Sequence, residues 1–181
     1  MKKTLSILTI CLTSSAAMAN SGPINFTGTV SSGGTCPIDV VTPGTGTPMP
    51  LLNLGDFRKK DFTAAGQETP AIGFALRITP DATCTIPSGA SANVTYTPAY
   101  GADSTGKLYA LQSGLGYSSG LALKISDRTG AQLDPNTASM DYPLSDTDPT
   151  EMIFSARLQT TAVAVTEGQV ATTVTYVVAV N

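Results

Sequence analysis

The last residues of the chain, 170–181, alternate between two kinds of side chain. The larger apolar residues share one face, and they are Val174, Tyr176, Val178 and Val180. Successive side chains of a β-strand point to opposite faces, so this pattern predicts a strand with one buried face. Because the alternation runs to the end of the sequence, we expect no closing strand after it, and one edge of this strand that another segment must cover.

Short alternating segments of the same kind recur along the chain, separated by turn sequences rich in Gly, Pro, Asp and Asn. The expected strands cover residues 24–30, 51–57, 72–78, 92–97, 107–111, 121–126, 152–158 and 170–180. Residues 63–68 are the best short helical candidate and are expected to form a loop. Many short strands in a chain of 181 residues predict a single all-β domain, an antiparallel β-sandwich.

Two expected strands indicate which face turns toward the core. Leu121, Leu123 and Ile125 share one face of the first. In residues 152–158 the face with Phe154, Ala156 and Leu158 is preferred over the face with Ile153 and Ser155. The preferred face buries the larger apolar side chains.

Residues 1–19 have the three parts of a bacterial secretory signal peptide: two lysines, an apolar run over residues 5–12, and Ala17-Met18-Ala19 before the expected cleavage. The apolar run is shorter than the roughly 20 residues that a membrane-spanning helix needs. The alternative of a membrane anchor is therefore disfavoured, and the mature chain is expected to start at Asn20.

The charge of the chain argues against nucleic acid as a partner. The net charge is −3 for the whole sequence, and loss of Lys2 and Lys3 with the signal peptide makes the mature chain more acidic. Phosphate contacts need clustered Lys and Arg. The longest basic run is Arg58-Lys59-Lys60, which we expect to be a solvated loop.

Cys36 and Cys84 are the cysteines of the mature chain, and after export an even pair is expected to form a disulfide. A redox or zinc pair is disfavoured, since the chain has no histidine and no CxxC motif. The lack of histidine also removes the usual general base. Asp146 and Asp148 are interpreted as a polar turn rather than a calcium site. We therefore expect no enzyme activity, no cofactor and no metal.

The start of the mature chain has a second unusual segment. Ile24 and Phe26 share one strand face and are flanked by Gly22 and Gly28. Such a segment could fill the open groove of another chain through main-chain hydrogen bonds and side chains set into pockets. Repeated head to tail, a contact of this kind gives a fibre.

Several of these segments, taken in order, resemble subunits of chaperone–usher fimbriae, the type 1 pilus family. They are residues 26–30, 54–55, 74–76, 94–96, 121–130, 153–158 and 175–178. Together with the spaced cysteine pair and the signal peptide, they extend the resemblance over nearly all of the mature chain.

The resemblance implies an incomplete immunoglobulin-like sandwich that lacks its final strand and is completed by a donor strand. It implies a donor extension at residues 20–28, followed by a pilin domain at 29–181. The implied donor residues are Gly22, Ile24, Phe26 and Gly28. The implied acceptor groove and chaperone contact consist of Val174, Tyr176, Val178, Val180 and Asn181. The implied disulfide is Cys36–Cys84.

The resemblance also implies the partners of the chain. A periplasmic chaperone would lend a strand to the groove and hold the carboxylate of Asn181, and at the outer-membrane usher the extension of the next subunit would replace it. The expected product is a fimbrium on the cell surface that supports adhesion. The alternative is a minor tip or adaptor pilin with lectin-like ligand binding. Val180 stands where these subunits often carry an aromatic residue.

Overall fold

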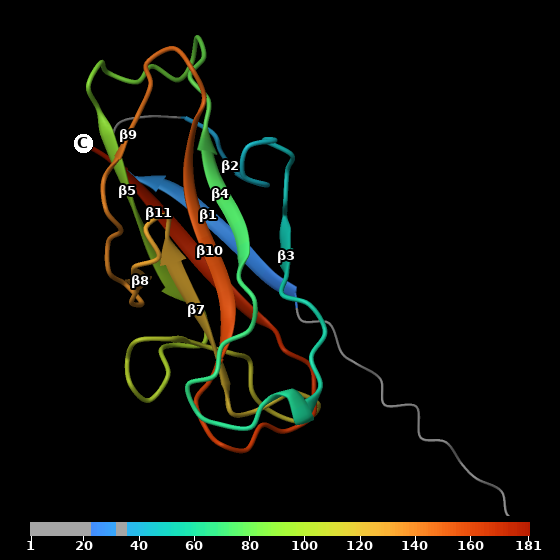
Figure 1. Cartoon of the computed structure of the whole chain (residues 1–181). Coiled ribbons are helices and arrows are strands. Elements are labelled where there is room, and N and C mark those ends of the chain that lie inside the picture. The colour runs from blue at the N-terminus through green and yellow to red at the C-terminus, as the bar shows by residue number, and fades with distance from the viewer. Residues whose placement is uncertain (1–22, 32–35) are drawn as a thin grey trace, which may run out of the picture.

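The computed structural model describes residues 23–31 and 36–181, which form two β-sheets packed face to face (Figure 1). The expected signal peptide, 1–19, and the expected donor residue Gly22 lie outside the described residues. The strands are β1 Pro23–Ser31, β2 Ile38–Val41, β3 Leu51–Asn53, β4 Ile72–Ile78, β5 Ser91–Pro98, β6 Tyr109–Ala110, β7 Leu121–Asp127, β8 Gln132–Leu133, β9 Tyr142–Pro143, β10 Thr150–Thr160 and β11 Thr172–Val180. A single 3-10 turn, η1, spans Lys59–Asp61 in this part of the chain.

The first sheet has the strand order β3-β1-β11-β5-β9. The second has the order β2-β4-β10-β7-β6, and β8 pairs with β7 beside it. Every pairing between these strands is antiparallel except that of β1 with β11. The predicted all-β sandwich is confirmed, and one pair of strands departs from the antiparallel pattern.

The long expected strands are present, but some short ones differ. The strand expected at 51–57 ends at Asn53, whose side-chain oxygen accepts a hydrogen bond from the Gly55 N–H at 2.9 Å. Gly55 has φ +95°, a conformation that breaks the strand. Strand β2 was not expected, since four residues are too few for a clear alternation.

The core between the sheets is centred on aromatic rings. The Phe154 ring stacks on Phe74 with centroids 5.7 Å apart and meets the edge of Tyr96 at 5.3 Å. The Tyr142 hydroxyl donates to the main-chain oxygen of Ile153 at 3.0 Å. Phe154 is 1% exposed and Ile153 is 39% exposed, so the predicted inward face of this strand is confirmed. The inward face predicted for Leu121, Leu123 and Ile125 is confirmed as well.

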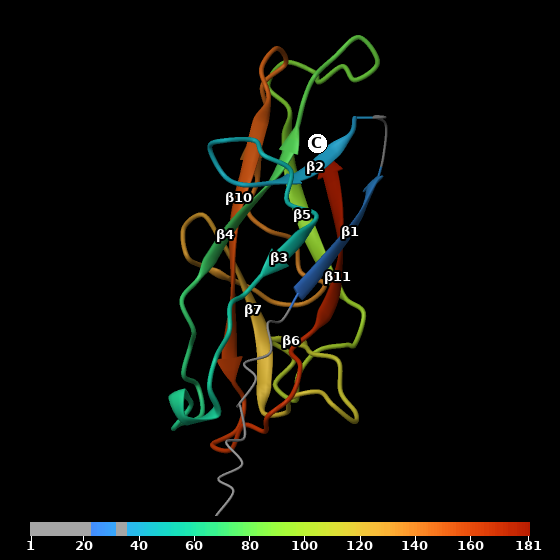
Figure 2. The ribbon, with the colours of Figure 1, turned by 90° about the vertical axis from the view of Figure 1, so that its right-hand side faces the viewer.

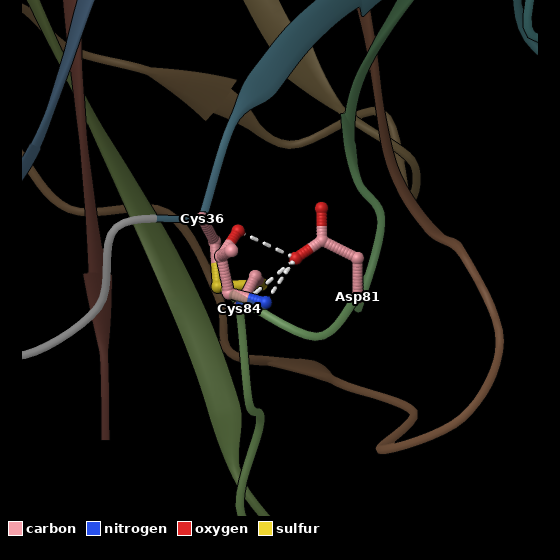
Figure 3. The surroundings of a disulfide bond; sticks show 4 residues. Cys36, Asp81 and Cys84 are labelled. Carbon is pink, nitrogen blue, oxygen red and sulfur yellow. Dashed lines mark hydrogen bonds between the residues drawn. A yellow bond between two sulfur atoms is a disulfide. The ribbon is translucent and has the colours of Figure 1, made fainter.

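A disulfide joins Cys36, just before β2, to Cys84, after β4 (Figure 3). Beside it, the Asp81 carboxylate accepts hydrogen bonds from the Thr83 hydroxyl at 2.7 Å and from the Cys84 N–H at 2.8 Å (Figure 3). These hydrogen bonds, with that of Thr83 first, hold the pKa of Asp81 below its usual value. The predicted disulfide is thus present, and it fixes the chain shortly after β1.

Candidate functional site: the groove between β3 and β11

Strand β1 lies between β3 and β11 in the first sheet (Figure 2). It runs parallel to β11 in a register that extends from Ile24↔Thr172 to Ser31↔Ala179. It runs antiparallel to β3 over Ile24↔Leu52 and its two neighbouring pairs. The N-terminal strand therefore supplies main-chain partners to the edge of β11 that the sequence predicts to need covering.

The strand that covers this edge belongs to the same chain. The sequence-based expectation was that the segment would act on a neighbouring subunit, and the structure instead places it in its own groove. Strand β1 also crosses the expected boundary after residue 28, since it continues to Ser31. The intermolecular donor role and the domain boundary remain predictions.

Both expected pocket residues of β1 face the core. Ile24 is 1% exposed and lies opposite Leu52, which is fully buried. Phe26 is half-buried, and its ring lies 4.7 Å from that of Phe74, centroid to centroid. Full burial of a side chain such as Ile24 stabilises a fold by about 1.5–3 kcal/mol. Gly28 is paired with Tyr176 in the β1–β11 register.

The alternation of β11 has the predicted orientation. Val174, Tyr176 and Val178 are buried, and Val180 is half-buried at the edge of the core. The hydroxyl of Tyr176 donates to the main-chain oxygen of Ile38 at 3.3 Å and so connects the two sheets. Burial raises the pKa of Tyr176, and the Asp39 carboxylate raises it further. This hydroxyl therefore stays neutral and can donate over the physiological pH range.

Two threonines pair on the outward face of the same two strands. The hydroxyl oxygens of Thr27 on β1 and Thr175 on β11 lie 3.1 Å apart and share a hydrogen bond. This pair gives β1 a contact on the solvent side as well as the core side. Asn25, also on β1, is exposed.

Asn181 closes the ladder between β11 and β5. Its N–H donates to the Ser91 oxygen at 2.8 Å, and its own main-chain oxygen accepts from the Ser91 N–H at 3.1 Å. The residue is exposed, so the end of the chain lies at the surface. Its expected role as a chaperone anchor remains a prediction.

Sequence reasoning identified only one wall of this groove. The other wall is β3, with Leu52 buried toward β1, and Phe74 of β4 forms part of its floor. The alternation of Leu52 and Leu54, which are both buried, is the signal that could have identified it. A strand of three residues gives too little pattern to show that it is the partner of β1.

The groove offers main-chain hydrogen bonds and apolar pockets, which is the chemistry of strand binding. Among the described residues, no group of three or more His, Cys, Asp or Glu side chains is arranged to hold a metal ion. No helix formed by residues 23–31 or 36–181 is long and apolar enough to cross a membrane.

The family model and the similar solved structures all concern fimbrial or pilus proteins. A family model described as "Fimbrial protein" matches residues 24–181. An antigen and type I fimbria protein of Burkholderia pseudomallei is 25% identical with a TM-score of 0.51, over 90% of this chain and 97% of that one. The P pilus rod subunit PapA is 15% identical with a TM-score of 0.58, over 81% of this chain and 99% of that one.

A subunit from a structure of a chaperone–usher pilus that addresses rod uncoiling has a TM-score of 0.59 at 12% identity, and the match covers 100% of this chain and 98% of that one. The last two similarities concern the fold alone. Among curated protein sequences, none matches this chain.

Proposed function

This chain belongs to the fimbrial protein family, and we propose that it is a structural subunit of a chaperone–usher fimbria that polymerises head to tail by donor-strand exchange. In this proposal the fibre is displayed at the cell surface and supports adhesion. A periplasmic chaperone and an outer-membrane usher handle the subunit before it joins the fibre.

The observation that carries the proposal is the position of β1 between β3 and β11. A terminal strand that is held by main-chain hydrogen bonds and a few side-chain pockets can be exchanged for the identical strand of another copy at low cost. Ile24 and Phe26 would then be buried in the groove of a neighbour. The same groove, with Val180 and Asn181 at its end, would receive the chaperone strand.

The direction of the inserted strand decides whether exchange gives a fibre. Strand β1 ends near the pole of the sandwich that holds Asn181 and the Cys36–Cys84 disulfide, which we call the C-terminal pole (Figure 1). If β1 entered a neighbour parallel to β11, two C-terminal poles would meet, and reciprocal exchange would close a dimer. Antiparallel entry brings the C-terminal pole of one subunit to the opposite pole of the next. That arrangement continues indefinitely, and antiparallel pairing is slightly more stable per residue.

The experiment that tests the proposal is deletion of residues 20–28. We expect loss of surface fibres, measured by electron microscopy and by immunoblotting of sheared fibres. Supplying residues 20–31 in the same chain, after Asn181 through a linker, is expected to restore a soluble monomer but not the fibre. Undiminished fibre formation by the deletion variant would refute donor-strand exchange.

A single-residue version of the test has a matched control in the same strand. Ile24→Asp places a charge in the buried pocket, whereas Asn25→Asp places the same charge on the exposed face. We expect the first to abolish fibres and the second to leave them at the wild-type level. Equal behaviour of the two variants would argue against a role for the pocket.

A further inference from the structure

A pair of exposed carboxylates lies at the C-terminal pole, on the loop that joins β9 to β10. Asp146 and Asp148, which we call the acidic tip, are both exposed. The loop is held by Ser145, whose hydroxyl oxygen accepts the Asp148 N–H at 2.9 Å and whose own N–H donates to the Thr150 hydroxyl at 3.0 Å. The two charges are therefore presented on an ordered turn.

A run of three cations lies at the opposite pole. Arg58, Lys59 and Lys60, which we call the basic turn, are exposed on and just before η1. The Asp61 carboxylate accepts the Arg58 N–H at 3.0 Å. Phe62, directly after the turn, is buried with 9% exposure. The basic turn is thus anchored to the core while its three charged side chains face solvent.

Within the described part of the subunit, no side-chain ion pair involves the acidic tip or the basic turn, although Asp56 and Asp61 flank the three cations of the turn. The ion pairs found there are Glu68 with Lys124 at 2.7 Å and Glu68 with Arg157 at 2.8 Å. Neither pair uses a residue of the acidic tip or of the basic turn. Because the acidic tip and the basic turn lie at opposite poles of one subunit, they can meet only between two copies of the chain. There their opposite charges are complementary.

Strand β10 runs from the loop after β9 toward the end of the sandwich that holds η1 (Figure 1). The acidic tip leads directly into its first residue, Thr150. At its last residue, the Thr160 N–H donates to the Gln67 oxygen at 2.9 Å, and the Gly66 N–H donates to the Thr160 oxygen at 2.8 Å. This ties the loop that follows the basic turn to the far end of β10. A shift of one copy along β10 therefore brings its acidic tip toward the basic turn of the next copy.

We propose that the acidic tip of one subunit docks on the basic turn of the next subunit in the fibre. This contact rests on the head-to-tail assembly proposed above and adds a second interface to the exchanged strand. It orients the incoming subunit, because complementary charges steer association before close contacts form.

The experiment compares fibre growth by the purified mature chain and its charge variants, followed by light scattering. One variant reverses the acidic tip with Asp146→Lys and Asp148→Lys, a second reverses the basic turn with Lys59→Glu and Lys60→Glu, and a third combines all four changes. We expect each double reversal to slow growth by about tenfold or more at low salt, which is the lower range for electrostatic steering. The combined variant is expected to recover most of the wild-type rate, since the charges are again complementary.

Salt provides the internal control. The difference between the variants should disappear near 1 M salt, where the screening length is about 3 Å instead of about 30 Å at 0.01 M. Arg128→Glu, which changes an exposed charge that stacks over Tyr142 at 5.2 Å, serves as the matched control and should grow normally. Thermal melting verifies that each monomer is folded.

Wild-type rates in both double reversals, or slow growth in the combined variant at every salt concentration, would overturn the proposed contact while leaving strand exchange intact. Growth of the 20–28 deletion variant at the wild-type rate would instead refute the proposed function itself.

Discussion

Ile24→Ala is the substitution that most directly measures how firmly β1 is held in the groove. The wild-type side chain is 1% exposed and lies between Leu52 of β3 and Thr172 of β11 in the strand register. The change removes three carbon atoms and leaves a cavity in a site whose walls belong to two different strands.

The expected cost follows from these contacts. Lost transfer free energy alone amounts to about 2.4 kcal/mol for three carbons at ~0.8 kcal/mol each. The cavity adds to this, so a total of about 3 kcal/mol is expected, within the usual range of about 2–5 kcal/mol for such substitutions. For a domain of this size, each kcal/mol lowers the melting temperature by about 2–4 °C, which gives about 6–12 °C.

The assay is urea and thermal unfolding of the purified monomer, monitored by circular dichroism. Asn25→Ala is the matched control, since Asn25 is the next residue of the same strand and is exposed. The control should change the free energy of unfolding by no more than about 0.5 kcal/mol. If Ile24→Ala is as stable as Asn25→Ala, β1 does not pack in the groove as described, and the reasoning fails.

Three further perturbations test other parts of the structure. Reduction of the disulfide should lower the free energy of unfolding by about 2–5 kcal/mol, measured by urea titration with and without reductant; an unchanged midpoint would contradict this. The hydrogen bond from Lys124 holds the pKa of Glu68 below its usual value, so the contribution of Glu68 is present at neutral pH and is lost as the pH falls through its folded pKa. Glu68→Gln should therefore lower stability by at most about 1 kcal/mol at neutral pH and by less in acid, and urea titrations across pH that show the opposite trend would exclude this. Gly168→Ala should destabilise strongly, since Gly168 has φ +152° and a Cβ there would overlap the main chain of Tyr117; an unchanged melting temperature would show that the loop adapts.

The sequence predicted the parts of the fold that local alternation encodes. The buried series on β11 and the choice of Phe154 over Ile153 follow from period two and side-chain size, and both agree with the structure. The Cys36–Cys84 pairing followed from the count of cysteines in the mature chain. These features need no knowledge of which strands are neighbours.

The partners of the strands were not predictable in the same way. Strand β1 and strand β11 meet through residues 148 positions apart, such as Thr27 and Thr175, and no local pattern specifies such a pairing. The second wall, Leu51–Asn53, is too short for its alternation to be distinguished from a loop. Whether β1 occupies its own groove or that of a neighbour depends on two alternative sets of contacts made by the same residues, and no local pattern in the sequence distinguishes them.

The central claim is that β1 leaves its own groove and enters that of another subunit in the fibre. A photo-crosslinking residue at position 27 tests it directly, because the Thr27 hydroxyl lies 3.1 Å from that of Thr175 on β11. Irradiated monomers should give crosslinks within one chain. Irradiated fibres should give a ladder of covalent multimers on a denaturing gel, with crosslinks that join β1 of one chain to β11 or β3 of another. Fibres that yield only crosslinks within single chains would contradict the account.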